Sequence, residues 1–404
     1  MQDKPKKIIF LTSTNLASNP RCRKEVELAC EQGYEVVVYA FEMQNWTNDK
    51  EIRIRESLNG VQYYSIQAGR KPVWPWLLSV IAGKVAKILY RAGIRTAWVN
   101  GVGVDKKTFL LIRAIRQTKP FGNLVIAHNP GALYPAWRYA QSSGIPYAVD
   151  IEDYYPGEGD DPVIQNMNTG LLKKILPAAR YITYASECFI KKINELSPGM
   201  ENRQQDIINN VFCATDFPVP VNDNTEKLQL VWFSQNIDRG RGLEQVLEVF
   251  DAFSEKINLV LIGNPKSPFV EEYLQQRTYV KIIESLPQEE LHKTISRYDI
   301  GLAIEPGRDL NNRLALSNKI WTYFQSGLYI LASNTESQAA FINRFGDHGK
   351  ITTLQKEPLS ETMSYLVNNR EKIRSDKKLR RENAQQYSWE HESQKLLRIW
   401  KMLS

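Results

Sequence analysis

The chain has 404 residues, with 52 Lys or Arg against 45 Asp or Glu, so its formal net charge is +7. Hydrophobic residues make up 43% and charged residues 24%, a composition that excludes wholesale disorder and predicts two or three domains. We expect no membrane span, because no run of about 18 uncharged apolar residues occurs. The four cysteines are too few for a disulfide scaffold, and they lack the CxxC spacing of a cysteine metal site. No secretory signal is recognised, and we expect a cytoplasmic protein.

Short apolar runs alternate with helical patterns in the first half of the chain, which indicates α/β architecture with a parallel sheet. Lys7–Thr12 is a predicted strand, and a predicted helix over 21–32 ends before Gly33, a residue typical of that position. Further strands are predicted at 35–39, 61–66, 124–127, 146–149 and 181–184.

The rhythm breaks at 216–225, a Pro/Asn/Asp-rich stretch that indicates a linker, and then restarts. Strands are predicted at 228–233, 258–262, 280–283, 300–303 and 329–332, with helices at 242–253 and 389–402. We therefore predict two Rossmann-like, doubly wound domains facing a cleft, 1–215 and 216–387. Ligands of such sheets bind beyond the carboxyl ends of the strands.

The loop after the first strand is rich in small polar residues and leads into a helix. Asn15, Ser18, Asn19 and Arg21 are its candidate binding residues. Backbone N–H groups at a helix start suit an anion or a sugar hydroxyl. The loop lacks GxGxxG, which argues against a dinucleotide, and an ordinary capped turn is the alternative.

Two further strand ends in this half carry candidate chemistry. His128 follows the strand at 124–127 and could bind substrate or move a proton, or it could simply bond to nearby backbone. Asp150, Glu152 and Asp153 follow the strand at 146–149. They could form the polar wall of a binding site, cap helices or bind a metal.

In the second half, Arg239, Gly240 and Arg241 lie in a loop between a predicted strand and a helix that begins at Gly242. Arginine side chains bind phosphate oxygens in pairs, and glycine allows the backbone to approach closely. This pattern suits the diphosphate of a nucleotide. The alternative is a tight turn with solvent-facing arginines.

A second loop of this half follows the strand at 300–303. Glu305 lies at its start and could accept hydrogen bonds from ribose or sugar hydroxyls. Asn318 and Lys319 then open a short predicted helix, whose start suits a phosphate with Lys319 adding charge. Asn318 could also be the N-cap of that helix.

The segment 71–95 combines tryptophan and aliphatic residues with Lys and Arg. A basic amphipathic helix of this kind can lie in a membrane interface. A helix packed on the core with a solvated basic face is the alternative.

Taken in order, these motifs resemble the GT-B-fold glycosyltransferases of the GT4-like type (glycosyltransferase group 1) over nearly the whole chain. The resemblance is carried by the residues KIIFLT, NPR, IAHNP, YAVDIED, IINNV, WFSQNIDRGRGLEQVLEVF, LVLIG, SLPQEEL, YDIGLAIEP and SNKIWTYFQSGLYILAS. It implies transfer of a sugar from a nucleotide sugar to an acceptor, usually with retention and without a metal or other cofactor. It also implies that the C-terminal helix, 388–404, crosses back onto the first domain.

The resemblance assigns roles to the candidate residues. His128 and Asp150 are then the catalytic candidates. The candidates for binding the donor nucleotide and its diphosphate are Arg239, Gly240, Arg241, Glu305, Asn318 and Lys319. The candidates on the acceptor side are Asn15, Ser18, Asn19 and Arg21.

The sequence also departs from this family. Leu314 and Thr322 occupy the positions of a glutamate pair that often binds ribose, and Ser234, Gln235 and Asn236 replace a glycine-rich turn. A catalytically inactive scaffold or binding protein therefore stays open as an alternative, as does a sugar-nucleotide epimerase.

The partners that follow are a nucleotide sugar and a glycan or lipid-linked acceptor, in surface polysaccharide or glycan biosynthesis. The inner face of the cell membrane is a further candidate, through 71–95. Nucleic acid is not expected, because the basic residues are dispersed and no recognised nucleic-acid module is present.

Overall fold

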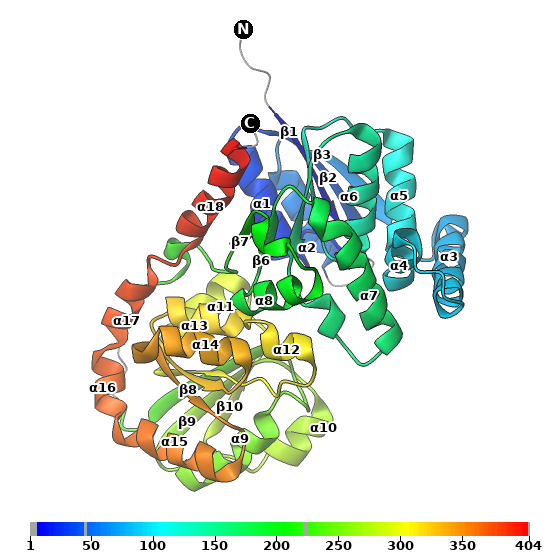
Figure 1. The fold of residues 1–404 in the computed structure, drawn as a ribbon. Coiled ribbons are helices and arrows are strands. Elements are labelled where there is room, and N and C mark those ends of the chain that lie inside the picture. Colours follow the sequence, from blue (N-terminus) through cyan, green and yellow to red (C-terminus); the bar gives the residue numbers. More distant parts are fainter. Residues whose placement is uncertain (1–5, 44–46, 221–224, 403–404) are drawn as a thin grey trace. The chain divides into compact units, whose positions relative to one another are not determined.

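The computed structural model describes residues 6–43, 47–220 and 225–402, which form two compact units (Figure 1). Unit 1 runs to Ile208 and includes the chain from Lys395 onward, and unit 2 runs from Asn209 to Gln394. The predicted boundary at 215/216 lies a few residues later in the chain, and the predicted linker, 216–225, belongs to unit 2. Residues 221–224 of that linker, and 403–404 of the C-terminal segment, lie outside the described residues.

Unit 1 is built on a parallel sheet of seven strands in the order β3-β2-β1-β4-β5-β6-β7. The strands are β1 (Lys7–Thr12), β2 (Glu35–Glu42), β3 (Gln62–Gln67), β4 (Leu124–His128), β5 (Tyr147–Ile151), β6 (Ile182–Tyr184) and β7 (Gln205–Ile207). All but the polar, three-residue β7 were predicted to within two residues of their starts.

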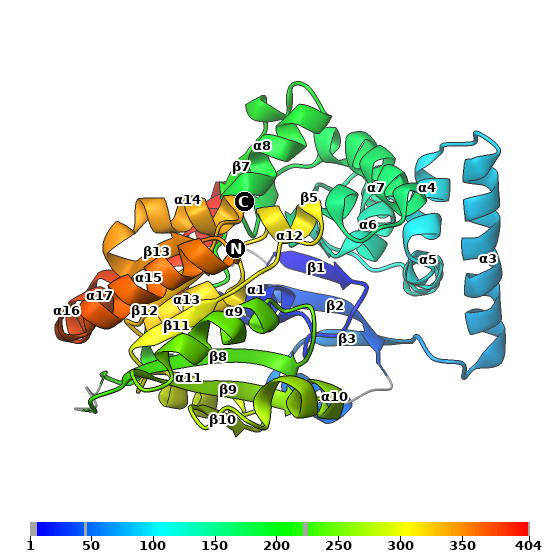
Figure 2. The same cartoon turned by 90° about the horizontal axis from the view of Figure 1, so that it is seen from below.

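The helices of unit 1 connect these strands and cover the sheet. They are α1 (Pro20–Glu31), α2 (Asn48–Ser57), α3 (Val73–Arg91), α4 (Ala97–Val104), α5 (Lys107–Thr118), α6 (Pro130–Ser143), α7 (Pro162–Ile175) and α8 (Glu187–Leu196). The end of α18 (Trp389–Met402) also belongs to this unit, where the Trp400 indole donates to the Tyr181 hydroxyl at 2.9 Å. In Figures 1 and 2, α3 lies at the outer margin of the unit, beyond α4 and α5.

Unit 2 contains a second parallel sheet, of six strands in the order β10-β9-β8-β11-β12-β13. The strands are β8 (Leu228–Ile237), β9 (Ile257–Pro265), β10 (Val280–Ile283), β11 (Ile300–Ala303), β12 (Tyr329–Ser333) and β13 (Gly349–Thr352). The edge strand β13 was not predicted, because its four residues alternate too briefly to show a period.

The helices of unit 2 lie on both faces of this sheet (Figure 2). They are α9 (Leu243–Phe250), α10 (Ser267–Phe269), α11 (Gln288–Ile295), α12 (Leu310–Leu314), α13 (Asn318–Gln325), α14 (Glu336–Arg344), α15 (Lys356–Asn368), α16 (Arg370–Ser375) and α17 (Lys377–Ala384). With a doubly wound parallel sheet in each unit, the predicted α/β fold class is confirmed.

Strand β8 runs four residues further than predicted, because a β-bulge carries it past Ser234. Phe233 pairs with Ile262 and Asn236 with Asn264, so β8 holds one residue more than β9 between these pairs. Gly263, with φ +153°, makes room for the bulge, since a Cβ there would lie 2.2 Å from the Ser234 carbonyl oxygen. Bulges are common beside binding sites, where they redirect the end of a strand.

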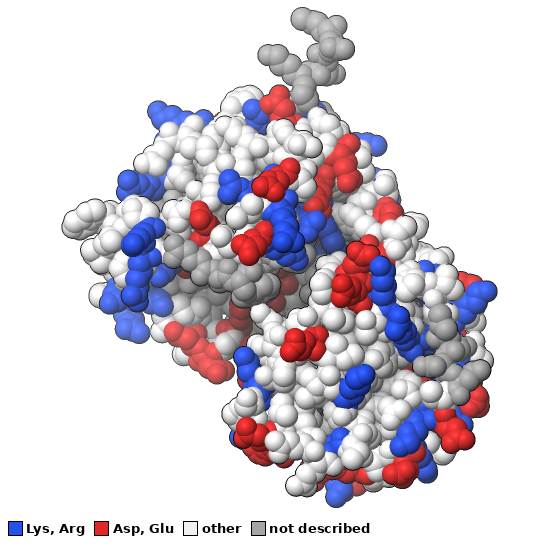
Figure 3. Space-filling model, turned by 180° about the vertical axis from the view of Figure 1, so that it is seen from behind, with Lys and Arg blue, Asp and Glu red and all other residues white. Residues whose placement is uncertain are grey.

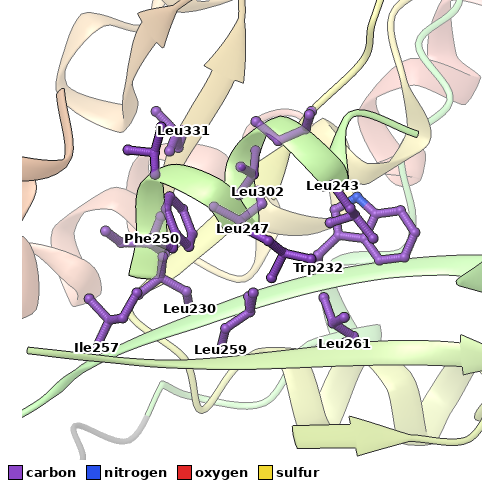
Figure 4. Packing of buried hydrophobic residues seen from close by; sticks show 14 of the residues in the cluster. Leu230, Trp232, Leu243, Leu247, Phe250, Ile257, Leu259, Leu261, Leu302 and Leu331 are labelled. Carbon is purple, nitrogen blue, oxygen red and sulfur yellow. The ribbon is translucent and has the colours of Figure 1, made fainter. Parts of the chain in front are cut away.

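One hydrophobic core of unit 2 lies where α9 packs on the sheet (Figure 4). Leu247 points from the middle of α9 toward Leu230 of β8, Leu259 of β9 and Leu302 of β11, and all four are fully buried. This packing anchors α9, so it fixes the loop that precedes the helix.

Leu247→Ala is expected to lower the stability of unit 2 by about 2–5 kcal/mol, because it removes buried methyl groups and leaves a cavity. Hydrogen exchange of the β8 and β9 amides measures this cost in the unit itself. Leu379→Ala in α17 is the matched control, since Leu379 is 57% exposed. A loss below about 0.5 kcal/mol, the range of surface substitutions, would contradict the core assignment.

Candidate functional site

In each sheet the strand order reverses at one place, and this fixes the candidate site. In unit 1 the reversal lies between β1 and β4, and in unit 2 between β8 and β11. Loops leaving the carboxyl ends of such neighbouring strands diverge and leave a crevice, where ligands of open α/β sheets bind. The candidate residues of both halves follow these strands or their neighbours.

Arg21 and Asp150 form a buried ion pair at this edge in unit 1. The Arg21 Nε and Nη2 atoms donate to the two Asp150 oxygens at 2.9 and 2.6 Å, and Nη1 donates to the Ile208 carbonyl at 2.6 Å. Thr183 donates a further hydrogen bond to Asp150 at 2.6 Å. Burial alone would raise the pKa of the Asp150 carboxyl, but Arg21 holds it well below its usual range. Arg21 therefore ties α1 to the end of β5 and to Ile208, directly after β7.

His128 lies beside this pair and is fully buried. Its Nδ1 is 3.0 Å from Glu152 and 3.4 Å from Asp150, and its Nε2 is 3.7 Å from Glu25. Burial disfavours the charged ring, but Cys22, Glu25 and Asp150 together outweigh burial and raise the His128 pKa well above its ordinary value. Burial raises the Glu25 pKa as well. A proton is therefore held between His128 and its carboxylate neighbours.

Asn129 is the strained residue of this site. Its φ of +69° with ψ of 156° is unusual for any residue except glycine, and surrounding contacts must hold it there. Its Oδ1 accepts hydrogen bonds from Thr12 and Asn19 at 2.7 and 3.2 Å, and its Nδ2 donates to Glu152 at 2.9 Å. Glu152 is partly exposed, so this carboxylate and the Asn129 amide lie on the solvent side of the buried His128.

The loop between β1 and α1 is held by its own side chains. The Asn15 Oδ1 accepts hydrogen bonds from the Ser18 backbone N–H and hydroxyl at 2.9 and 2.5 Å. Asn19 is the N-cap of α1, accepting from the Cys22 N–H at 2.9 Å, while its Nδ2 donates to Glu152 at 2.7 Å. The loop is therefore the capped turn that was the alternative expectation, and its capping residue Asn19 also belongs to the polar cluster at the strand ends. Whether these residues bind an acceptor stays a prediction.

Glu25, His128 and Asp150 each place one ligand atom within 4.8 Å of the others, a grouping that could hold a metal ion. However, the Arg21 guanidinium already occupies both Asp150 oxygens. A positive charge is therefore in place where a cation would bind. The donor set fits a buried hydrogen-bonded ion network better than a metal centre.

The loop after β8 in unit 2 depends on two glycines. Gly240 and Gly242 have φ of +71° and +80°, and a Cβ on Gly242 would lie 2.6 Å from Ile304. The Gly240 N–H donates to the Glu244 carboxylate of α9 at 2.5 Å. The loop therefore packs directly against the chain that follows β11, as the strand order requires.

Three arginines accompany this loop. Arg239 pairs with Glu272 and is more than half exposed. Arg241 is half-buried and makes no ion pair within the described ranges 6–43, 47–220 and 225–402. Arg308, from the loop after β11, brings its guanidinium carbon 3.4 Å from where a Cβ on Gly240 would lie. Arg241 and Arg308 are thus the cations available to an anion here, while Arg239 would have to leave Glu272.

Glu305 and Lys319 form a nearly buried ion pair, with the Lys319 Nζ 2.6 Å from the Glu305 Oε1. Lys319 also lies over the Trp232 ring, 5.7 Å from its centre. The N-cap of α13 is Ser317 rather than Asn318, so that alternative is corrected. Asn318 is exposed, and its Oδ1 accepts from the Asn210 side chain at 2.8 Å. The pair places a carboxylate and an ammonium near the end of β11.

The two residues that stand in place of the glutamate pair, Leu314 and Thr322, have structural roles. Leu314 is buried in α12, and Thr322 is buried in α13, where its hydroxyl bonds to the Asn318 carbonyl at 3.1 Å. Neither offers a charged group. In this region Glu305 supplies a carboxylate instead.

Sequence reasoning missed Glu25 and Arg308. Glu25 lies one turn after Arg21 on α1, so helical spacing would have placed the two on one face. Arg308 could have been found only from the strand order, because β8 and β11 are neighbours in the sheet although far apart in sequence. The predicted site residues of each unit lie at the switch edge of that unit. Their catalytic and binding roles stay predictions.

Arg21→Gln is expected to destabilise unit 1 by about 3–5 kcal/mol, because it leaves the Asp150 charge buried without its partner. Arg23→Gln on the same helix is the control, since Arg23 forms only an exposed pair with Glu27 and should cost less than about 0.5 kcal/mol. Hydrogen exchange of the β5 and β6 amides measures both. Equal effects would show that the buried pair contributes nothing.

Replacing His128 tests its charge through pH. Protonated His128 stabilises the folded state, because its pKa is higher there than in the unfolded chain. This stabilisation is complete below the unfolded-state pKa of about 6.5. It is lost as the pH rises through the folded-state pKa. The melting temperature of His128→Asn should therefore lie furthest below the wild type under pH 6.5 and approach it as the pH rises through the raised folded-state pKa of His128. His391→Asn, at an exposed histidine, is the control. A gap independent of pH would refute the charged histidine.

Comparison with known proteins finds similar folds among solved structures. No family model matches this sequence, and no curated protein matches it. Among solved structures, sucrose-phosphate synthase from Thermosynechococcus elongatus is similar at TM-score 0.69 and 14% identity, covering 98% of this chain and 99% of that one. HepE of Anabaena in complex with UDP is similar at TM-score 0.67 and 12% identity, covering 98% and 100%. A glycosyltransferase from Rickettsia africae matches at TM-score 0.67 and 12% identity, covering 99% of both chains. The chain therefore has the two-domain α/β fold of the GT-B glycosyltransferases.

Proposed function

We propose that this protein is a glycosyltransferase that moves a sugar from a nucleotide-sugar donor to a glycan or lipid-linked acceptor. The observation that carries the proposal is the switch edge of unit 2. There Arg308 approaches the Gly240–Gly242 loop, and Gly242 packs on Ile304, the chain neighbour of Glu305, which pairs with Lys319 at the start of α13. Glycines in the left-handed region, guanidinium groups and a helix N-terminus are the groups that bind a diphosphate. HepE, which shares this fold, has been crystallised with UDP and with UDP-glucose.

The chemistry follows from charge. When the bond between the anomeric carbon and the diphosphate oxygen breaks, negative charge grows on the leaving nucleotide. Arg241 and Arg308 stabilise that charge as it develops, and Lys319 joins them by turning from Glu305 to the diphosphate. In the retaining reaction that we propose, the acceptor oxygen bonds to the anomeric carbon, and its proton passes to the leaving phosphate. This route requires no protein nucleophile and no metal.

Unit 1 supplies the acceptor side in this proposal. Its partly exposed polar groups, Asn129 and Glu152, accept hydrogen bonds from sugar hydroxyls or donate to them. The buried His128 acts through Glu152, which it holds at 3.0 Å, while the buried Asp150 fixes Arg21. The acceptor belongs to surface polysaccharide or glycan synthesis, at the cytoplasmic face of a membrane.

The donor site is tested by Arg241→Ala combined with Lys319→Ala. Loss of two charged contacts to the diphosphate should weaken nucleoside diphosphate binding about 100-fold or more and abolish transfer. Binding is measured by thermal shift over UDP, GDP, ADP and dTDP, because a ligand of the folded state raises its melting temperature. Lys293→Ala, at an exposed lysine of α11, is the control. Unchanged nucleotide affinity in the double variant would overturn the donor site.

A catalytically inactive binding protein is the second candidate, favoured by the uncharged Leu314 and Thr322. It predicts that the wild type binds a nucleoside diphosphate yet neither transfers nor hydrolyses the sugar. Incubation with single nucleotide sugars, with and without glycan acceptors, separates the cases. Turnover of one nucleotide sugar into an isomer, without an acceptor, would instead indicate the epimerase.

A further inference from the structure

Helix α3 has two unlike faces. Ser79, Gly83, Ala86 and Tyr90 form the buried face, on the side of α4. Gly83 allows close contact, since a Cβ there would lie 3.5 Å from the Cβ of Lys106. The opposite face carries large apolar side chains that are 41–74% exposed, namely Trp74, Leu78, Ile81, Val85 and Ile88.

These five side chains recur at every third or fourth residue and therefore form one continuous stripe along the helix. In both ribbon views α3 lies at the outer margin of unit 1, with α4 and α5 on its inner side (Figures 1 and 2). Only 17% of the most apolar window of α3 is buried. A continuous exposed apolar surface of this kind marks an interaction site.

Cations line one flank of the stripe. By helical spacing, Lys84, Lys87 and Arg91 follow the same side of α3, between the stripe and the buried face. Lys84 and Lys87 also line a hollow of about 340 Å³ together with Lys106, beside α4. The three lysines form no ion pair in the part of the chain that the structure describes. Their charges are therefore available to a partner.

The charge of the whole region is one-sided. Residues 57–149 contain twelve Lys or Arg and one carboxylate, Asp105, for a net charge of +11. The other residues have 40 Lys or Arg against 44 Asp or Glu, a net charge of −4. The excess positive charge of the protein thus comes from this segment, which includes α3 to α6. Figure 3 shows Lys and Arg spread along the margin of unit 1 on the side where α3 lies.

We propose that α3 docks unit 1 on an anionic phospholipid bilayer. The stripe enters the acyl boundary with Trp74 at one end, and Lys84, Lys87 and Lys106 take headgroup phosphates. By length and composition α3 is the one helix among the described residues that could cross a membrane, contrary to our expectation that none could. Its small-residue face is packed on α4, however, so it lies along the surface.

Charge complementarity selects the lipid over a second copy of this chain. Two copies joined by their stripes would bring two segments of +11 together, whereas an anionic surface neutralises them. Each basic residue near such a surface adds attraction that salt screens.

Vesicle flotation without donor or acceptor tests the proposal, so its failure is distinct from failure of the glycosyl-transfer proposal. The wild type should bind vesicles of phosphatidylcholine and phosphatidylglycerol (7:3) at least tenfold better than phosphatidylcholine alone. Ile81→Asn with Ile88→Asn should abolish binding. Lys84→Gln with Lys87→Gln should weaken it on the order of tenfold and flatten its salt dependence.

The matched controls lie in unit 2. Leu379→Asn, with a 57% exposed leucine, and Lys293→Gln should bind as the wild type does. Thermal melting confirms that every variant is folded. The proposal is overturned if the stripe variants still bind, if binding ignores lipid charge, or if the stripe variants instead convert a dimer to a monomer in light scattering without vesicles.

Discussion

The reversal of strand order within each sheet is the constraint on which the rest of this structure depends. Parallel strands all end at the same edge, but only between β1 and β4, and between β8 and β11, do the following loops turn in opposite directions. Chemistry-bearing residues far apart in sequence meet there. Asn19 reaches Asn129 and Glu152 in unit 1, and Arg308 reaches Gly240 in unit 2. The site residues are thus positioned by topology before any side chain makes a contact.

The charged side chains at the switch edges of the two units differ in their burial. In unit 1 the charges are buried: Arg21 and Asp150 have almost no exposed surface, and each satisfies the other. Such a pair adds little net stability relative to apolar packing, but breaking it is costly, so it favours one geometry over others. That geometry holds His128 behind the partly exposed Glu152. In unit 2 Arg241 and Arg308 stay accessible, which suits a site that must exchange an anion at each turnover.

Short apolar runs between helical patterns predicted both sheets, since buried parallel strands such as β4 and β11 are nearly continuous apolar runs. It failed for β7 and β13, which are short edge strands with few buried residues. The positions of His128, Arg241 and Lys319 were predictable because they follow recognisable strands. Their partners were not, because the pairing of Arg21 with Asp150, or of Lys319 with Glu305, is set by three-dimensional neighbours that no local pattern encodes. The bulge at Ser234 was likewise hidden, since Gly263, which permits it, lies on another strand.

The uses of positive charge in this chain separate by burial. Arg21 in unit 1 forms a buried ion pair with Asp150, and Arg374 in unit 2 forms one with Asp299. These charges therefore stabilise the fold and are not available to a partner. The lysines of α3 have no carboxylate near them in sequence, since none occurs between Glu56 and Asp105. An exposed cation without a counter-charge contributes nothing to folding and costs repulsion from its neighbours. Lys84, Lys87 and Arg91 beside a stripe of exposed apolar residues are unfavourable for an isolated unit 1. An anionic, apolar-cored surface relieves the repulsion and the exposure together, and this coincidence, more than either feature alone, is the physical argument for the membrane.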